Sequence, residues 1–355
     1  MPDNPLPPLV YQAYDPGPKE LRVWPRNRPK QRYWLHLLLF LATCLSTLSI
    51  GARLEHDFRA GIWPYSDDDN FLPWSWALED WHRLADGVPF SACLLGILTA
   101  HEFGHYVLCR RRGVEATLPF FIPFPSLIGT LGAVIRIKSP IRSRKDLFDI
   151  GIAGPIAGFV VAVPVLVVSL LYSKPLTLQP PENGWPVLGF PLIFDLVRWI
   201  LAFLGSQSPA AHLSANHLYL APTAIAAWVG MLATALNLLP GGQLDGGHII
   251  FALNPRAHRW VSRSCILALL VFSWYLWVGW LVWAILLRIT GSRHPVVPAE
   301  PGLGRGSRML SLVAAILLLL TWMPAPLPGT TLPEAAKSIS RGVSEGIHNW
   351  RHPSK

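Results

Sequence analysis

The sequence predicts an all-α polytopic membrane protein with about six transmembrane helices and a small re-entrant or interfacial β-hairpin. Of its 355 residues, 51% are hydrophobic and only 14% are charged, whereas charged residues average about 25% in soluble domains. Several apolar runs are long enough to cross a lipid bilayer, and basic residues cluster in the short segments beside them. Because the basic residues lie beside the apolar runs, we attribute the net charge of +9 to the orientation of the protein in a membrane and not to nucleic-acid binding.

The segment before the first apolar run is rich in proline and in basic side chains. We expect residues 1–33 to form a disordered basic arm on the cytoplasmic side. No cleavable signal is expected, because the first apolar run starts late and lacks a clear small-residue cleavage site. The first transmembrane helix is expected over residues 34–52, and the acidic loop that follows, to residue 87, is expected outside.

The apolar run 88–109 is expected to form the second span, and it contains the motif His-Glu-Phe-Gly-His at residues 101–105. On a helix, residues i and i+4 share one face, so both imidazoles can bind one metal ion. The alternative is a chance match with ordinary core histidines, but burying these groups in a membrane is costly without a partner or a function. Three arginines at 110–112 predict that His105 lies about 6 Å from the cytoplasmic end.

The segment 117–137 is apolar but contains three prolines and two glycines, so a straight helix is not expected. Its last part is rich in β-branched residues and is followed by basic residues. We expect a hairpin that lines the metal site, because irregular backbone at membrane depth is tolerated only where protein or a wet cavity covers it. The alternative is an ordinary cytoplasmic loop.

The third span is expected over residues 148–172, and glycines spaced through 151–158 give it a smooth face for close helix packing. By itself this pattern is common in membrane helices. The external segment 173–218 contains an apolar piece, 187–204, which we expect to be amphipathic or partly inserted. A full crossing there would place the end of the next span on the wrong side of the membrane.

The fourth span is expected over residues 219–239 and is followed by Pro240, several glycines and Asp245. Alternation of the spans puts this carboxylate at the cytoplasmic level of the histidines, where it can complete a metal site. On its own, Asp-Gly is also a common turn dipeptide. Two further apolar segments follow, at 264–290 and 309–323, and the first is either one long span or a bent hairpin.

These motifs, taken in order, resemble the site-2 protease family of intramembrane zinc metalloproteases over about residues 88–248. The resemblance implies that His101, His105 and Asp245 bind one Zn2+ per chain. It implies that Glu102 is the general base and acid, and that Asn237 helps to bind the substrate or its oxyanion.

Several short runs are most similar to the bacterial and plastid branch that includes the ethylene-dependent gravitropism-deficient proteins. They are residues 129–137, Ser139-Pro140, Phe148-Asp149-Ile150 and Ala153-Gly154-Pro155. Many bacterial members of the family carry a PDZ domain, but neither segment 173–218 nor the cytoplasmic loop has room for one. The expected organisation is an arm (1–33), a first helix with its external loop (34–87), an intramembrane metalloprotease core (88–250), C-terminal spans (251–325) and a polar tail (326–355).

The resemblance implies hydrolysis of peptide bonds within or near transmembrane segments of other membrane proteins. It also implies an integral protein of the bacterial inner membrane, with the active site near the cytoplasmic side. A di-iron membrane desaturase or hydroxylase is one alternative, but it needs many more histidine ligands. A non-catalytic zinc-binding membrane protein, either a transporter or an inactive scaffold, is another alternative. The intact Glu102 argues against an inactive scaffold, and a transporter should show duplicated halves. The sequence indicates neither the oligomeric state nor the identity of the substrate.

A transmembrane substrate must be unwound before cleavage, because a helix hides each carbonyl behind an i to i+4 hydrogen bond. An exposed strand edge can pair with the unwound backbone and replace those lost bonds. We expect the segment Gly129–Ile137 to supply this edge, with Gly129, Gly132, Ala133 and Val134 contacting the substrate.

Overall fold

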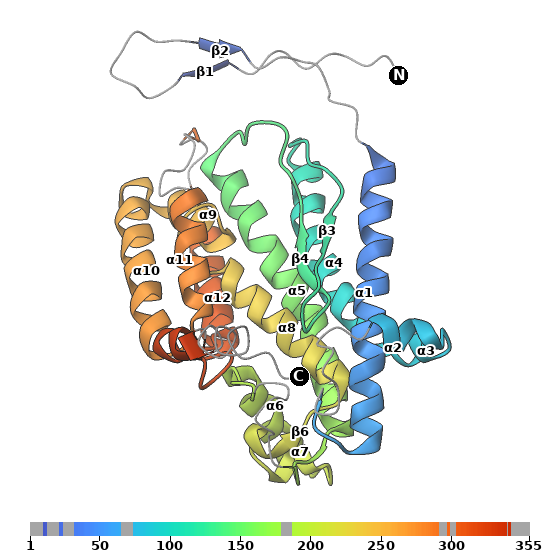
Figure 1. Cartoon of the computed structure of the whole chain (residues 1–355). Coiled ribbons are helices and arrows are strands. Elements are labelled where there is room, and N and C mark those ends of the chain that lie inside the picture. Colours follow the sequence, from blue (N-terminus) through green and yellow to red (C-terminus); the bar gives the residue numbers. More distant parts are fainter. Residues whose placement is uncertain are drawn as a thin grey trace.

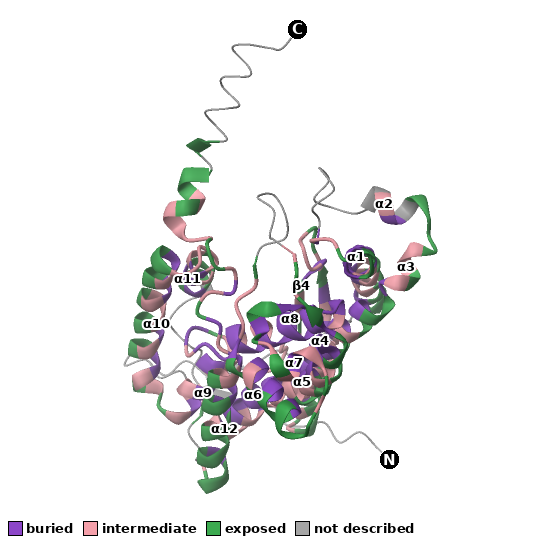
Figure 2. Cartoon of the chain, turned by 90° about the horizontal axis from the view of Figure 1, so that it is seen from below, coloured by how far each residue is buried: buried purple, intermediate pink, exposed green. Residues whose placement is uncertain are grey.

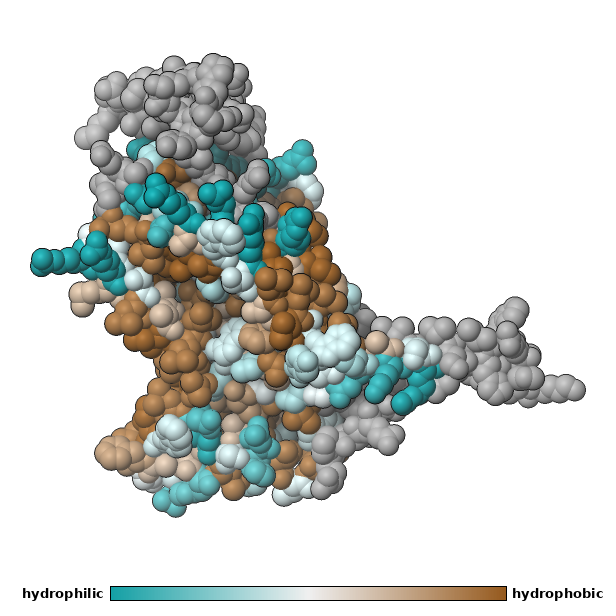
Figure 3. All heavy atoms as spheres, turned by 90° about the vertical axis from the view of Figure 1, so that its left-hand side faces the viewer, coloured by the Kyte–Doolittle hydropathy of each residue, from teal (hydrophilic) through white to brown (hydrophobic). Residues whose placement is uncertain are grey.

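The protein is built around three long apolar helices. The computed structural model describes residues 10–12, 21–23, 32–64, 74–178, 187–290, 297–298, 303–338 and 340–341. Within them, α1 (Tyr33–Ala60), α4 (Val88–Arg111) and α5 (Arg144–Tyr172) are the helices long and apolar enough to cross a membrane. Figure 3 shows hydrophobic side chains in a band between hydrophilic groups at the two ends of the molecule. The first three expected spans are therefore present.

Shorter elements surround these helices (Figure 1). The helices are α2 (Trp74–Glu79), α3 (Arg83–Asp86), α6 (Leu192–Phe203), α7 (Pro209–His212), a 3-10 turn (Ala215–His217), α8 (Pro222–Asn237), α9 (Asp245–Leu253), α10 (Pro255–Tyr275), α11 (Gly279–Thr290) and α12 (Arg305–Thr321). Three antiparallel strand pairs join β1 (Val10–Gln12) to β2 (Leu21–Val23), β3 (Phe120–Pro123) to β4 (Thr130–Val134), and β5 (Lys174–Pro175) to β6 (Leu218–Tyr219). The expected basic arm lies largely outside the described residues, apart from the β1–β2 pair.

The core lies where α4, α5 and α8 pack together. Figure 2 shows buried residues concentrated around these three helices and exposed residues on the outer faces of α10 and α12. Close approach of α1 to α4 depends on glycine, since a Cβ at Gly87 would lie 2.0 Å from the carbonyl oxygen of Leu48. The Thr47 and Ser91 hydroxyls bond across this contact at 2.7 Å, and such a bond between membrane helices contributes about 0.6 kcal/mol.

The expected β-hairpin is present as β3 and β4, which lie between α1 and α4 (Figure 1). Its turn uses Gly129, at φ +78°, and β4 contains Gly132, at φ +105°, both in the left-handed region that favours glycine. Two side chains of α1 hold the hairpin. His36 Nδ1 bonds to the carbonyl oxygen of Pro119 at 3.1 Å, and Ser46 Oγ donates to that of Gly129 at 2.5 Å.

The apolar piece expected to be amphipathic forms α6, a 12-residue helix at the opposite end of the molecule from the N-terminal end of α1 (Figure 1). A helix of this length extends only about 18 Å, too short for a bilayer core of about 30 Å. One face is buried through Phe194 and Val197, whereas Trp199 and Phe203 are exposed. The prediction that this piece is not a span is confirmed.

The open question about the segment 264–290 is answered by a bend. α10 ends at Tyr275, α11 starts at Gly279, and the two helices pack against each other. This reversal returns the chain to the end of the molecule where α10 began (Figure 1). The expectation of six spans is not confirmed. α8 has 16 residues, α11 has 12 and α12 has 17, so each falls short of the roughly 20 residues that cross a bilayer.

Candidate metal centre

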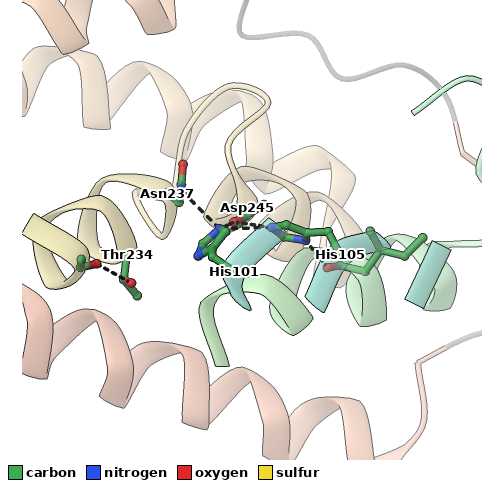
Figure 4. A network of polar contacts seen from close by, with 7 residues as sticks. His101, His105, Thr234, Asn237 and Asp245 are labelled. Atoms are coloured by element: carbon green, nitrogen blue, oxygen red, sulfur yellow. Dashed lines mark hydrogen bonds and ion pairs between the residues drawn. The ribbon is translucent and has the colours of Figure 1, made fainter. Parts of the chain in front are cut away.

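The two predicted histidine ligands lie one turn apart on α4 and point to the same place (Figure 4). Both side chains are buried, with His101 5% exposed and His105 6% exposed. Between them lies Gly104, where a Cβ would be 2.5 Å from the carbonyl oxygen of Ala153 on α5. Glycine at this position therefore lets α4 approach α5 closely, and the histidines are covered by that helix.

Asp245 reaches the histidines because the chain turns sharply after α8. α8 ends at Asn237, and the following turn includes Gly242 at φ +58°. α9 then begins at Asp245, so the carboxylate lies in the first turn, where the helix dipole favours a negative charge. A Cβ at Gly246 would lie 2.1 Å from the carbonyl oxygen of Leu238. The glycine after the aspartate is thus required by the packing of α9 on the turn.

The three donor atoms form a nearly equilateral triangle. His101 Nε2 lies 3.2 Å from His105 Nε2, and Asp245 Oδ2 lies 3.2 Å from each of these nitrogens. Ligands bound at 2.0–2.1 Å to one tetrahedral zinc ion are roughly 3.3 Å apart. The spacing of the donors therefore fits a zinc ion with three protein ligands and one open position.

The hydrogen bonding of His105 also favours a cation. Its Nδ1 donates to the carbonyl oxygen of Ile150 at 2.7 Å, so the neutral ring presents a lone pair at Nε2. That lone pair faces the Asp245 carboxylate oxygen, which is also an acceptor. Two acceptors this close repel each other unless a proton or a metal ion lies between them. A backbone carbonyl that fixes the ring in this way is typical of metal-binding histidines.

The glycines of α5 form the floor of the site. A Cβ at Gly154 would lie 2.1 Å from His105 Nε2, and one at Gly158 would lie 3.2 Å from His101 Cβ and Nδ1. Gly151 faces α9 instead, 3.2 Å from the Cβ of His248 by the same measure. One glycine face therefore accommodates both helices that carry the three donor residues, which is more than the generic packing role that the sequence indicated.

Glu102, the predicted general base, is 7% exposed, and the backbone N–H of Ile135 lies near its carboxylate. Ile135 directly follows β4, so the hairpin contacts the carboxylate next to the metal ligands. This proximity and the packing of β4 against α4 support the expectation that the hairpin lines the site.

The residues predicted to bind substrate lie in three places: at the metal site, on β4 and in the hairpin turn. Asn237 Nδ2 lies 3.2 Å from His101 Nε2 and points to the metal site (Figure 4). Gly132, Ala133 and Val134 lie on β4. Gly129 instead lies in the hairpin turn, where its carbonyl is bound by α1, so we assign it to the attachment of the hairpin.

Within the part of the chain that the structure describes, His101, His105 and Asp245 are the one set of His, Cys, Asp or Glu donors close enough to share a metal ion. A di-iron centre needs a second cluster of ligands beside the first. The described residues therefore do not favour the desaturase or hydroxylase alternative.

The sequence matches the profile of Peptidase family M50 over residues 89–276, which include all three donor residues, Glu102 and Asn237. The chain belongs to peptidase family M50. The resemblance to the site-2 protease family is thereby confirmed. The match also extends through α10, beyond the last metal-ligand motif.

Three relatives carry the same description, probable zinc metalloprotease, chloroplastic. EGY1 of Arabidopsis thaliana is 28% identical over 322 residues, which cover 89% of this chain and 56% of the relative. EGY2 of Oryza sativa subsp. indica is 30% identical over 270 residues, which cover 73% of this chain and 46% of the relative. EGY2 of Arabidopsis thaliana is 29% identical over 256 residues, which cover 71% of this chain and 44% of the relative. The chain thus spans about half the length of the curated relatives it matches.

Sequence reasoning missed the backbone groups that orient the site. The carbonyl of Ile150 and the N–H of Ile135 have no signature in the sequence, because every residue carries such groups. The glycines at 154 and 158 were visible as a pattern, but their contact with the histidines depends on the register between α4 and α5.

Proposed function

We propose that this chain is an intramembrane zinc metalloprotease that hydrolyses peptide bonds within or near the transmembrane segments of other membrane proteins. The observation that carries the proposal is the triangle of three donor atoms, each 3.2 Å from the others, with Glu102 directly beside His101. Membership of peptidase family M50 and the relatives described as zinc metalloproteases support the same conclusion.

The residues divide the chemistry between them. His101, His105 and Asp245 would hold the zinc ion, which supplies a Lewis acid and a water of lowered pKa. The Glu102 carboxylate takes a proton from the attacking water as the water oxygen bonds to the carbonyl carbon. When the C–N bond breaks, Glu102 gives this proton to the departing nitrogen. The backbone N–H of Ile135 lies near this carboxylate.

Asn237 is suited to bind the substrate carbonyl. Its Nδ2 is an uncharged donor near His101 Nε2, and donors aimed at an oxygen that gains negative charge lower the barrier of acyl transfer. We therefore assign to Asn237 the stabilisation of the oxyanion.

Metal analysis combined with a cleavage assay tests the proposal. The purified 355-residue chain is expected to contain one zinc ion and to cleave a membrane-embedded reporter, and removal of zinc by a chelator should stop cleavage until zinc is restored. Two iron ions per chain would indicate the di-iron alternative. Zinc without any cleavage across a panel of transmembrane reporters would indicate a non-catalytic zinc protein.

We further propose that the unpaired edge of β4 binds the unwound substrate. The N–H of Arg136 donates to the Thr117 hydroxyl on the β3 side, whereas the N–H of Ile135 faces Glu102. Alternate residues of a strand direct their N–H groups to the same edge. By this alternation the N–H of Ala133 shares the edge of Ile135, and that of Val134 points toward β3 with that of Arg136.

Replacing Ala133 with proline is expected to reduce cleavage by at least about tenfold with zinc content unchanged, because proline removes a donor from the substrate edge. Ala133→Val, which keeps the N–H, is the matched control and should stay active. Val134→Pro removes an N–H that points toward β3, so any effect on cleavage would come from a weaker β3–β4 pairing and not from a lost bond to the substrate. Reporter cleavage and zinc content should be measured on all three proteins, and equal tolerance of proline at 133 and 134 would count against strand addition.

We propose that the metal site lies near the membrane face that carries the basic residues. Two arginines end α4 and a third follows it directly, and Arg144 and Lys145 begin α5 at the same end of the molecule (Figure 1). An excess of Lys and Arg marks the cytoplasmic side of bacterial membrane proteins. The relatives are chloroplastic, so they do not support the expected bacterial inner membrane, and the proposal concerns only the face.

Cysteine labelling tests this orientation. In a variant without the four native cysteines, a cysteine at Gly113 should react with a membrane-impermeant maleimide only after the membrane is opened. A cysteine at Asp68, which lies outside the described residues but within the loop expected to be external, should react in intact cells. Labelling of both after solubilisation is the control for accessibility, and the reversed pattern in intact cells would overturn the orientation.

A further inference from the structure

Two buried side chains of α10 bind the turn that leads to Asp245. The N–H of Gly242 donates to Ser262 Oγ at 3.2 Å, and His258 Nε2 donates to the carbonyl oxygen of Gly242 at 3.0 Å. Both side chains are buried, with His258 1% exposed and Ser262 0%. Residues 258 and 262 are four apart on α10, so they share one face. One face of a neighbouring helix thus binds both backbone polar groups of a single residue.

This residue lies at the critical point of the turn. Gly242 has φ +58° and precedes the ligand Asp245 by three residues. Its carbonyl also contacts α9, since a Cβ at Gly247 would lie 2.5 Å from the Gly242 oxygen. A shift of Gly242 would therefore move the first turn of α9 and with it the carboxylate. The fit to zinc requires Asp245 Oδ2 to stay 3.2 Å from both imidazoles.

We propose that His258 and Ser262 are positioning residues that fix Asp245 for metal binding, an inference that rests on the proposed zinc site. Neither residue belongs to the donor set; they act through the backbone of Gly242. Without them the N–H and carbonyl of a buried turn lose their partners, and the turn must rearrange to recover hydrogen bonds. Partners of this kind around metal ligands typically change metal affinity 10- to 100-fold when removed.

The test measures zinc affinity of the full-length protein in detergent by competition with a chelator. His258→Ala and Ser262→Ala are each expected to weaken zinc binding about tenfold or more. Ser273→Ala is the matched control, because Ser273 is equally buried on α10 but bonds to the carbonyl of Leu270 in its own helix. This control should bind zinc like the original protein.

Two substitutions of His258 separate a positioning role from general packing. Glutamine can place an amide donor near the Nε2 position, so His258→Gln is expected to bind zinc within about threefold of the original protein. Asparagine is too short to reach Gly242 and should bind as weakly as alanine. The visible spectrum of the cobalt-substituted protein should change in the alanine variants and stay unchanged in His258→Gln.

The outcomes distinguish this inference from the proposed function. If the original protein binds no zinc, the proposed function fails and the inference falls with it. If it binds zinc and the His258 and Ser262 variants bind equally well, the inference alone is overturned. A lower melting temperature of the metal-free variants with unchanged zinc affinity would likewise assign both residues to stability only. Should His258→Ala not fold, Ser262→Ala decides.

Discussion

The Glu102→Gln protein is expected to keep one zinc ion per chain and to lose cleavage by about 10²- to 10⁴-fold, the usual contribution of a general acid–base group. Glutamine has the shape of glutamate but cannot take a proton from water at neutral pH. The donor residues His101, His105 and Asp245 are unchanged, so metal binding should persist. Reporter cleavage and zinc content measured on the same preparation check both halves of this expectation.

Alanine at each donor position provides the comparison. His101→Ala, His105→Ala and Asp245→Ala should all lose zinc, because two ligands do not hold the ion as three do. Loss of cleavage with zinc present would thus be specific to Glu102, and the same variant should retain bound substrates for identification by mass spectrometry. A fully active Glu102→Gln protein would show that the catalytic role assigned to Glu102 is wrong.

The parts of the site that the sequence predicted are local in the chain. The spacing of His101 and His105 by four residues is sufficient to place both rings on one helix face. Proline and glycine between 117 and 137 argued against a straight helix, and the β-branched residues at the end of this segment favoured a hairpin, although an ordinary loop stayed open as the alternative. The third donor, Asp245, was proposed from an expected alternation of spans that counted α8 as a crossing, but α8 has only 16 residues, and it is the turn after Asn237 that brings Asp245 to the histidines.

The remaining features depend on contacts between distant segments. The bend between α10 and α11 falls at residues 276–278, inside an apolar run without proline, so hydropathy alone could not separate it from one long span. The position of the Ile135 N–H near Glu102 follows from where the hairpin lies against α4. The role of Gly154 follows from the helix register, and this role gives a sharp test.

Replacing Gly154 with alanine is expected to weaken zinc binding at least about 100-fold while leaving the helices intact. The new Cβ would lie 2.1 Å from His105 Nε2, the ligand atom itself. The imidazole could relieve this contact only by rotating, which would break its bond to the Ile150 carbonyl and turn Nε2 away from the other donors. Alanine otherwise favours a helix by about 1 kcal/mol over glycine, so the helix should persist. Chelator competition for zinc and circular dichroism measure the two effects.

Two other glycines supply graded controls for Gly154→Ala. A Cβ at Gly158 would lie 3.2 Å from His101, a contact that a shift of a few tenths of an ångström can relieve, so Gly158→Ala should weaken zinc binding less. A Cβ at Gly96, on α4 but away from the site, would meet no atom within 4 Å, and Gly96→Ala should bind zinc normally. Zinc affinity is therefore expected to be highest in Gly96→Ala, lower in Gly158→Ala and lowest in Gly154→Ala. Normal zinc binding by Gly154→Ala would mean that α5 does not lie against His105 as described, because no arrangement with a Cβ 2.1 Å from the ligand nitrogen can hold the ion.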